Sequence, residues 1–465
     1  MTTQSLFRKI SIAICLLISL SQTPQAQINT ISNKSQALLD EIILFEESIG
    51  VSAGILMNDE IEWVGAVGYQ DLENRIAFNI ETKNRTASIA KPMTAIAILQ
   101  LYEQNKLDID DPINTYLPSF PNDSTDQITI RHLLHHNSGI RAYQSNNEAY
   151  PTSNYESLDE AINVFKNRSL QFSPGTDYLY TTYGYVVLGA IIERVSGMSF
   201  RNYMKANIWN KASMHNTDVE IYGADYPNKA RLYHKQPNGE IVPGITTNLS
   251  VKVPGGGFYS TTKDLLSFGQ AILNNVLIKP ETFDIMMTDP GTKSRGNPYL
   301  MGWFQYGDKS SKNGLTIGHS GSQSGTSTQL MIHLEKKIVV VVLANTSGVW
   351  NNIFDLTIKL SENAMYPELL KQTLPQIISI TDSILDNYVG SYQSNEEAVR
   401  RIQKIDGDLY VFLNNNISYR MYSTAKNIFF IRRAGITIDF VENEKTKSYD
   451  LVINDNGEKY TYSKI

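Results

Sequence analysis

An unbroken apolar run near residue 340 constrains the fold of this chain more than any other feature. The segment Ile338-Val339-Val340-Val341-Val342-Leu343 contains no polar residue. β-Branched residues favour strands, and a strand without polar positions is typical of one that is covered on both faces. The sequence therefore predicts a central strand in a sheet that lies between two layers.

Further strand and helix patterns complete a domain around this strand. Val51–Met57 and Glu60–Gly68 have strand patterns around an Asn-Asp turn, and Thr326–Leu334 precedes the central strand, Ile338–Asn345. Helical patterns lie between these two pairs, at Ala87–Glu103, Leu158–Phe165, Tyr185–Val195 and Asp264–Leu273. Strands at both ends of a region with helices between them predict an α+β domain whose sheet joins N- and C-terminal segments.

The chain has a different pattern after residue 370. A short helix or entry segment is expected at Asp382–Gly390, and from Tyr392 onward strand patterns follow one another at short intervals, with turns such as Asp406-Gly407 between them. This spacing predicts a small antiparallel β-barrel, with a sandwich as the alternative. We therefore expect an α+β domain at residues 27–370, a linker at 371–381 and a β domain at 382–465.

The N-terminus has the pattern of a secretory signal. Arg8 and Lys9 precede the apolar run Ile10–Leu20, which is too short to span a bilayer comfortably, and a polar segment ends at Ala26. We expect cleavage after Ala26 and a periplasmic or secreted bacterial protein with no membrane span after cleavage. The alternative is an uncleaved anchor, because Pro24 is not the small residue that signal peptidases prefer at the −3 position.

Composition excludes several kinds of chemistry. Cys15, the only cysteine, lies in the expected signal, so the mature chain offers no disulfide, cysteine nucleophile or zinc-thiolate site. The formal net charge is −6 and the sequence has no basic runs, which argues against nucleic acid or anionic membranes as partners. His132, His135 and His136 lack a carboxylate or cysteine at ligand spacing, so we expect capping or core roles rather than zinc binding.

Three Ser-x-x-Lys segments could each place a nucleophile beside a base. On a helix, residues i and i+3 share a face, which would bring the lysine amine to the serine hydroxyl. Ser423 precedes a strand-like segment, and we expect Ser260 to cap the helix that starts near Asp264. Ser88 alone opens a long buried helix, where Pro92 is tolerated in the first turn and the helix dipole favours an oxyanion.

Five segments together resemble the serine β-lactamase and penicillin-binding-protein superfamily, in its class C-related branch. They follow the family's order: Arg85–Ala95, Thr129–Ile140, Pro174–Tyr185, Gly255–Thr261 with Asp264, and Gly318–Ser322. The resemblance covers about residues 40–360. It implies a β-lactamase/DD-peptidase-like antiparallel sheet flanked by helices, and the C-terminal β domain resembles the lipocalin-like appendage of some relatives.

The resemblance also implies the catalytic roles. Ser88 would attack a carbonyl while Lys91 and Tyr180 move the protons, and an acyl-enzyme would form and be hydrolysed. Lys91 can accept the Ser88 proton if burial or a neighbouring cation keeps the amine neutral. The backbone N–H groups of Ser88 and Ser322 would form the oxyanion hole. Neither a metal nor an organic cofactor is needed.

The residues expected to contact the substrate are Thr182, His319 and Gly321, and two of them depart from the family pattern. Thr182 stands where the second motif ends in Asn, and His319 stands where the third motif begins with Lys. The charge of a histidine depends on its surroundings near neutral pH, so His319 is a less dependable cation than lysine. Both departures point away from penicillin-like side chains and toward a small ester, amide or D-amino-acid peptide as the substrate. The alternatives are a β-lactamase or D-alanyl-D-alanine carboxypeptidase, and a non-catalytic penicillin-binding-like sensor of cell-wall fragments.

Overall fold

The computed structural model describes residues 24–45, 47–121, 127–294, 296–369, 377–395, 397–405, 407–413, 418–431, 436–455 and 457–465. They divide into two compact units, one formed by residues up to His234 and from Pro243 to 369, the other by residues 235–242 and from 377 to the end. The predicted signal lies outside the described residues except for its last three, which begin helix α2 (Pro24–Leu44).

A nine-stranded antiparallel sheet forms the centre of the first unit. Its strand order is β3-β2-β1-β14-β13-β12-β11-β10-β9. The strands are β1 (Gly50–Met57), β2 (Glu60–Asp71), β3 (Ile76–Ala77), β9 (Lys293–Ser294), β10 (Asn297–Leu300), β11 (Trp303–Gly307), β12 (Thr316–Gln323), β13 (Thr326–His333) and β14 (Ile338–Ala344). Strand β14 pairs with β1 from the N-terminal half of the chain and with β13, so the sheet joins the two ends of the domain as predicted.

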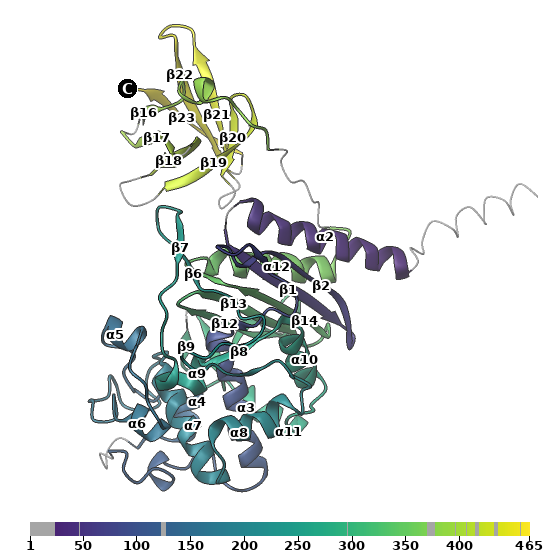
Figure 1. The fold of residues 1–465 in the computed structure, drawn as a ribbon, viewed down its shortest axis with the longest axis vertical. Helices are drawn as coiled ribbons and strands as arrows, with labels where there is room; N and C mark the ends of the chain where they lie inside the picture. The colour runs from purple at the N-terminus through teal and green to yellow at the C-terminus, as the bar shows by residue number, and fades with distance from the viewer. Residues whose placement is uncertain are drawn as a thin grey trace, which may run out of the picture. The chain divides into compact units, whose positions relative to one another are not determined.

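The apolar strand β14 is covered on both faces, as its composition predicts. Val339, Val341 and Leu343 belong to one core cluster, whereas the alternating residues Ile338, Val340, Val342 and Ala344 belong to another. Helices α2 and α12 (Trp350–Met365) supply the second cluster, and α10 (Thr262–Leu273) contributes to the first. Figure 1 shows these helices on opposite sides of the sheet.

The remaining helices of this unit precede α12 in the chain, and those labelled in Figure 1 lie on the α10 side of the sheet. They are η1 (Ala87–Ile89), α3 (Ala90–Glu103), η2 (Ile113–Thr115), α4 (Ile130–Leu134), α5 (Asn146–Ala149), α6 (Leu158–Ile162), α7 (Thr182–Ser196), α8 (Phe200–Met204), η3 (Lys205–Trp209), η4 (Ser250–Lys252), α9 (Val253–Gly256) and α11 (Pro280–Met286). Helix α3 is buried from Ala90 to Leu101, as a helix apolar on nearly every face requires.

Several short strands lie outside the main sheet. Strands β4 (Asn84–Arg85) and β5 (Asp218–Val219) both pair with β8 (Phe258–Ser260). The other short strands are β6 (Tyr233–Lys235), β7 (Ile241–Pro243) and β15 (Thr346–Ser347).

The predicted cap of helix α10 is wrong by one residue. Thr261 is the N-cap, because its hydroxyl accepts a hydrogen bond from the Asp264 N–H. Ser260 instead ends strand β8, and its hydroxyl lies 2.7 Å from that of Thr217. Both residues suit a cap, and the pairing of β8 decides between them.

The second unit contains a closed antiparallel barrel, in agreement with the barrel rather than the sandwich prediction. After α13 (Asp382–Leu385), its strands are β16 (Gly390–Ser394), β17 (Val399–Ile405), β18 (Asp408–Phe412), β19 (Ser418–Ala425), β20 (Ile428–Ile431), β21 (Ile436–Asn443), β22 (Ser448–Asp455) and β23 (Glu458–Lys464). Aromatic rings fill its core, where Tyr388 stacks on Phe440 at 4.2 Å between ring centroids.

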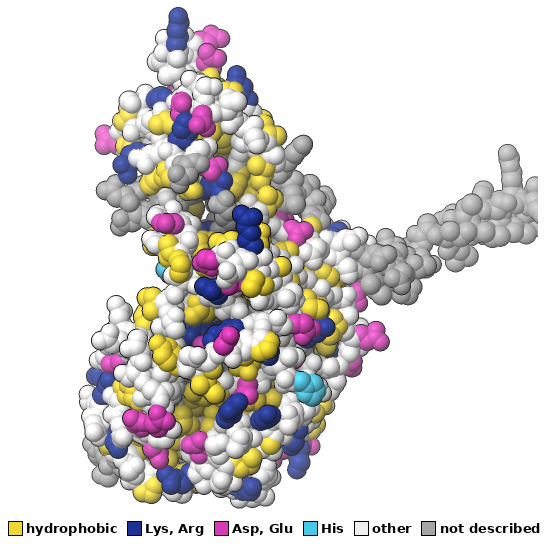
Figure 2. All heavy atoms as spheres, in the orientation of Figure 1, with side chains coloured by type: hydrophobic (Ala, Val, Ile, Leu, Met, Phe, Trp, Pro, Cys, Tyr) yellow, Lys and Arg dark blue, Asp and Glu magenta, His cyan; other side chains and the backbone are white. Residues whose placement is uncertain are grey.

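Two features bear on membrane or polyanion partners, namely the distribution of charged side chains and the composition of the helices. Acidic and basic side chains are interspersed on the face shown in Figure 2. Within the described ranges, no helix combines the length and the apolar composition that a bilayer crossing requires.

Candidate active site

Ser88 lies in a tight turn that leads into the buried helix α3. The preceding residue, Ala87, has a left-handed backbone with φ of 47°, and Ser88 itself is half-buried while its neighbours are buried. The Thr86 N–H donates to the carbonyl of Phe258, which fixes the turn to strand β8. Pro92 falls in the first turn of α3, where its missing N–H is tolerated.

Lys91 lies beside Ser88, as the Ser-x-x-Lys spacing predicts. Its Nζ atom is 3.0 Å from Ser88 Oγ, 2.7 Å from the Gly255 carbonyl oxygen and 3.4 Å from Thr182 Oγ1. The side chain is fully buried, and no described carboxylate contacts it. Burial, and secondarily repulsion from Lys252, hold the pKa of Lys91 well below its usual value. Both effects favour the neutral form of the amine over the charged form.

Tyr180 lies close to both Ser88 and Lys91. Its ring centroid is 4.8 Å from Lys91 Nζ, and its hydroxyl interacts with that of Ser88. Burial raises the pKa of Tyr180 well above its usual value, and the Ser88 contact only partly opposes this. Tyr180 is therefore a phenol, so any proton passes through its hydroxyl rather than to a phenolate.

Thr182 belongs to the same polar cluster. It is the first residue of α7, and its hydroxyl contacts Lys91 and the hydroxyl of Tyr143. The N-cap of α7 is Thr181, whose hydroxyl accepts from the Tyr183 N–H and so fixes the start of this helix behind the cluster.

His319 is buried in strand β12, and both of its ring nitrogens have partners. Nδ1 lies 2.6 Å from the Ser320 carbonyl oxygen, and Nε2 lies 3.0 Å from the Tyr299 hydroxyl. A carbonyl can only accept, so Nδ1 carries the proton and Nε2 accepts from Tyr299. Burial, then repulsion from Lys91, lowers the pKa of His319 to about 3. The third motif therefore presents no cation at neutral pH.

Gly321 brings strand β12 against the nucleophile turn. A Cβ atom at this position would lie 2.4 Å from the Thr86 carbonyl oxygen and 3.0 Å from Ala87 Cβ. Only glycine permits this approach. The next residue, Ser322, is exposed, and Gln323 donates to the Gly256 carbonyl at 3.2 Å. The turn with Ser88 and the strand with Ser322 therefore meet beside α9.

The three clustered histidines have capping and core roles, as expected. His132 completes a capping box with Thr129 at the start of α4. His135 is buried against the Tyr299 carbonyl, and His136 packs against Tyr180 at 4.3 Å between ring centroids. In the part of the chain that the structure describes, no group of three His, Cys, Asp or Glu residues could hold a metal ion.

The structure adds three residues to the site that the sequence analysis does not single out. Tyr299 donates to His319, and Tyr143 contacts Thr182. Lys252 is the cation whose charge lowers the pKa of Lys91. Lys252 has the clearest signal in the sequence, a single charge between Val251 and Val253 just before the Gly255–Gly257 segment. Nothing in the local pattern around either tyrosine distinguishes it from the other tyrosines of the chain.

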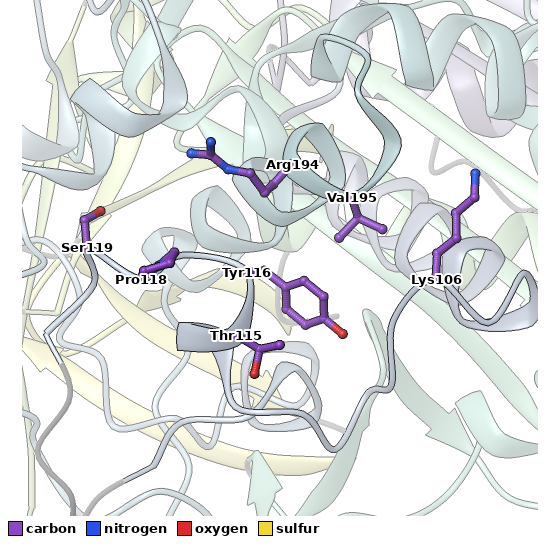
Figure 3. Close-up of a pocket in the computed structure, with 7 residues that line it drawn as sticks. All are labelled: Lys106, Thr115, Tyr116, Pro118, Ser119, Arg194 and Val195. Carbon is purple, nitrogen blue, oxygen red and sulfur yellow. The ribbon is translucent and has the colours of Figure 1, made fainter.

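A separate surface hollow of about 710 Å³ lies at the C-terminal end of α7. Figure 3 shows Tyr116 with Lys106 and Arg194 around it, together with four smaller side chains. None of its lining residues belongs to the Ser88 cluster, and it holds no buried nucleophile or base.

The antiparallel sheet flanked by helices, with a serine and a buried lysine side by side at the start of a buried helix, defines the β-lactamase-fold class of serine hydrolases. A family model described as Beta-lactamase matches residues 44–359, and the chain belongs to this family.

Individual relatives are more distant. The human mitochondrial serine beta-lactamase-like protein LACTB is 28% identical over 415 residues, covering 67% of this chain and 76% of the relative. Penicillin-binding protein 4* of Bacillus subtilis is 25% identical over 419 residues, covering 84% and 90%. Among solved structures, an octameric penicillin-binding protein homologue from Pyrococcus abyssi matches with a TM-score of 0.66 at 23% identity, covering 92% of this chain and 99% of that one. A D-amino acid amidase from Ochrobactrum anthropi matches with a TM-score of 0.62 at 20% identity, covering 72% and 98%.

Proposed function

We propose that the protein hydrolyses a small ester or amide through an acyl-enzyme on Ser88. One observation carries the proposal: the buried Lys91 amine lies 3.0 Å from the Ser88 hydroxyl and has no carboxylate partner among the described residues. A neutral amine at hydrogen-bonding distance from a serine is an activated nucleophile and its base.

The contacts of Lys91 orient its lone pair. A neutral amine has two hydrogens and one lone pair. The Gly255 carbonyl and the Thr182 hydroxyl accept the hydrogens, which leaves the lone pair for the Ser88 proton. As Ser88 attacks the carbonyl carbon, its proton moves to Lys91, and the N–H groups of Ser88 and Ser322 stabilise the oxyanion.

Tyr180 completes the proton path. Its hydroxyl contacts Ser88 and its ring lies over Lys91 Nζ, so it can pass the proton from Lys91 to the leaving group. Water then attacks the acyl-enzyme and gives a proton to the Lys91–Tyr180 pair, which passes a proton to Ser88 Oγ as the acyl bond breaks and the acid is released.

The surroundings of the motifs favour esters and simple amides over β-lactams. The neutral His319 has both nitrogens occupied, and the Thr182 hydroxyl accepts from Lys91 and contacts the Tyr143 hydroxyl, so neither offers a free donor to a substrate carboxylate or acylamino group. A D-amino acid amidase with the same fold supports a small amide as one candidate. We also propose that residues 1–26 are an export signal, so that the substrate lies outside the cytoplasm.

Active-site labelling tests the mechanism. We expect a fluorophosphonate probe to modify the wild-type protein at Ser88, as read by mass spectrometry, and to leave Ser88→Ala unmodified. Ser260→Ala and Ser423→Ala are matched controls, because both serines belong to the other Ser-x-x-Lys segments and should not affect labelling. Absence of labelling, or labelling of Ser88→Ala, would favour a non-catalytic sensor.

A substrate panel tests the specificity. We expect turnover of p-nitrophenyl acetate or a D-amino acid amide, with nitrocefin and a D-Ala-D-Ala peptide as poor substrates. Rapid nitrocefin or D-Ala-D-Ala hydrolysis with an inert ester would assign the protein to the β-lactamases or carboxypeptidases instead.

A further inference from the structure

A second lysine is buried next to the catalytic cluster and has no part in the mechanism above. Lys252 is the N-cap residue of α9, the short helix whose Gly255 carbonyl accepts from Lys91. Its side chain is only 5% exposed. Its Nζ donates to the Ala149 carbonyl at 2.7 Å and lies 5.3 Å from the ring centroid of Tyr143.

Among the residues that the structure describes, no carboxylate pairs with the Lys252 ammonium. One carbonyl dipole and one aromatic face stabilise it, and no carboxylate of the described chain raises its pKa. Glu148, the residue before Ala149, is paired with Arg168 at 2.9 Å. Arg85, the cation whose charge lowers the pKa of Lys252, is itself paired with the buried Glu220. An isolated buried charge costs folding free energy, so its presence next to the cluster needs a reason.

A short chain of contacts connects this ammonium to the proton acceptor. Tyr143, whose ring faces Lys252, contacts the Thr182 hydroxyl, and Thr182 Oγ1 lies 3.4 Å from Lys91 Nζ. Lys252 therefore begins the short helix whose Gly255 carbonyl accepts from Lys91, and Tyr143 connects it to Thr182.

We propose that Lys252 is a positioning residue whose unpaired charge repels a proton from Lys91 and so keeps Lys91 able to accept the proton of Ser88. The inference rests on the proposed function, because it concerns the base of that reaction. It adds to that function because the protonation of Lys91 would depend on Lys252, a residue outside the sequence motifs.

The charges around both lysines agree with this role. The titratable groups near Lys91 are His136 and His319, which burial keeps neutral, and the phenols Tyr180 and Tyr185. None of these groups carries a charge that could offset Lys252.

Lys252 itself remains largely charged at neutral pH. Burial and the nearby Arg85 lower its pKa to about 8, which leaves most molecules protonated at pH 7. Burial lowers the pKa of Lys91 most, and the charge of Lys252 lowers it further.

The test replaces the charge and follows the pH profile of acylation. Lys252→Gln removes the charge but keeps a donor for the Ala149 carbonyl, and Lys252→Arg keeps the charge. Lys263→Gln is the matched control, because Lys263 is exposed and pairs only with Glu81. The rate of fluorophosphonate labelling of Ser88 and kcat/KM for p-nitrophenyl acetate are measured from pH 5 to 9, and thermal unfolding checks the fold of each variant.

We expect the acid limb of the Lys252→Gln profile to move up by about one pH unit, because the Lys91 amine then holds its proton more tightly. Rates on the alkaline plateau should change little, and the Lys252→Arg and Lys263→Gln profiles should match the wild type. If Lys252→Gln does not fold, Lys252→Met provides the second neutral variant.

Two results would overturn the inference while leaving the proposed function in place. One is an acid limb that does not move in the neutral variants; the other is an equal loss of rate at every pH, which would indicate a merely structural role in holding the loop at Ala149. A wild-type protein that is not labelled at Ser88 would overturn the proposed function and this inference with it.

Discussion

The burial of Lys91, which supplies the proposed base, also lowers the free energy of unfolding at neutral pH. Its pKa is lowered on folding, so between the native and unfolded pKa values the unfolded chain binds a proton that the native protein does not. Stability therefore falls as the pH drops from about 10 through this window.

The first prediction follows for Lys91→Met. We expect this variant to lose at least about 100-fold in kcat/KM, because the general base is removed. We also expect it to gain roughly 1–3 kcal/mol in the free energy of unfolding at pH 7, because a buried amine is replaced by an apolar side chain of similar length. Urea unfolding at pH 7 and pH 10 checks both the sign and its cause, since the gain should shrink at pH 10. A loss of stability at pH 7 would contradict this account.

A buried ion pair anchors the strand that leads into the nucleophile turn. Arg85 donates to both carboxylate oxygens of Glu220, at 2.8 and 2.6 Å, and both side chains are buried. Arg85 also donates to the Ser324 carbonyl beside strand β12. The pair therefore connects two segments that the site requires.

The second prediction concerns this pair. Arg85→Met should lower the free energy of unfolding by about 3–5 kcal/mol, because Glu220 is left as an uncompensated buried charge. Arg131→Met is the control, since its pair with Asp110 is exposed and should be worth at most about 1 kcal/mol. Denaturant unfolding measures both, and equal losses would show that burial is not the cause.

For single residues, the sequence predicts contacts between positions that are close in the chain. It does not predict contacts between positions that only the folded structure brings together. Ser88 and Lys91 are three positions apart, so their contact follows from helical spacing. Lys252 and Tyr299 reach the cluster through α9 and β10, elements far from Ser88 in the chain. No local pattern encodes such an approach.

Periodicity predicts the larger elements well. The hairpin of β1 and β2, helix α3 and the apolar strand β14 lie within a few residues of their predicted ranges. Helix α7 begins at Thr182, three residues before its apolar pattern, because the Thr181 cap sets its start. Composition describes buried positions, whereas caps and strand pairing decide where an element begins.

The third prediction is made at the level of strand β12. Gly321→Ala would place a Cβ atom against the Thr86 carbonyl, so β12 must move away from the Ser88 turn. A displacement of this kind should lower kcat/KM about 100-fold and cost about 1–3 kcal/mol of stability.

Gly184→Ala is the matched control for Gly321→Ala. A Cβ atom there meets nothing closer than 3.6 Å, and alanine favours the helix, so stability should be retained or slightly increased. Retention of full activity by Gly321→Ala would contradict the oxyanion arrangement proposed here.

The two units of the molecule have separate cores. Core residues of the first unit belong to two clusters around its sheet, and those of the barrel belong to a third. A closed barrel has no unpaired edge strand, which removes the usual reason why a small β domain needs a partner.

The fourth prediction is that residues 377–465 fold alone. We expect circular dichroism of this fragment to show β structure and a cooperative thermal transition, because its core is complete. Phe440→Ala, which removes a ring from that core, should cost about 3–5 kcal/mol in the same fragment. A fragment without a cooperative transition would show that the barrel depends on the rest of the chain.

The pairing of Val51 with Ala344 means that the central sheet of the first unit cannot be completed until late in synthesis. During translation, β1 has only the β2 hairpin as its neighbour until residues near 344 leave the ribosome, and a long loop must then close. The nascent chain therefore exposes an unpaired strand edge for most of its synthesis, which favours aggregation or capture by chaperones. A polypeptide truncated before residue 338 would carry Ser88 and Lys91 but lack the strand that pairs with β1.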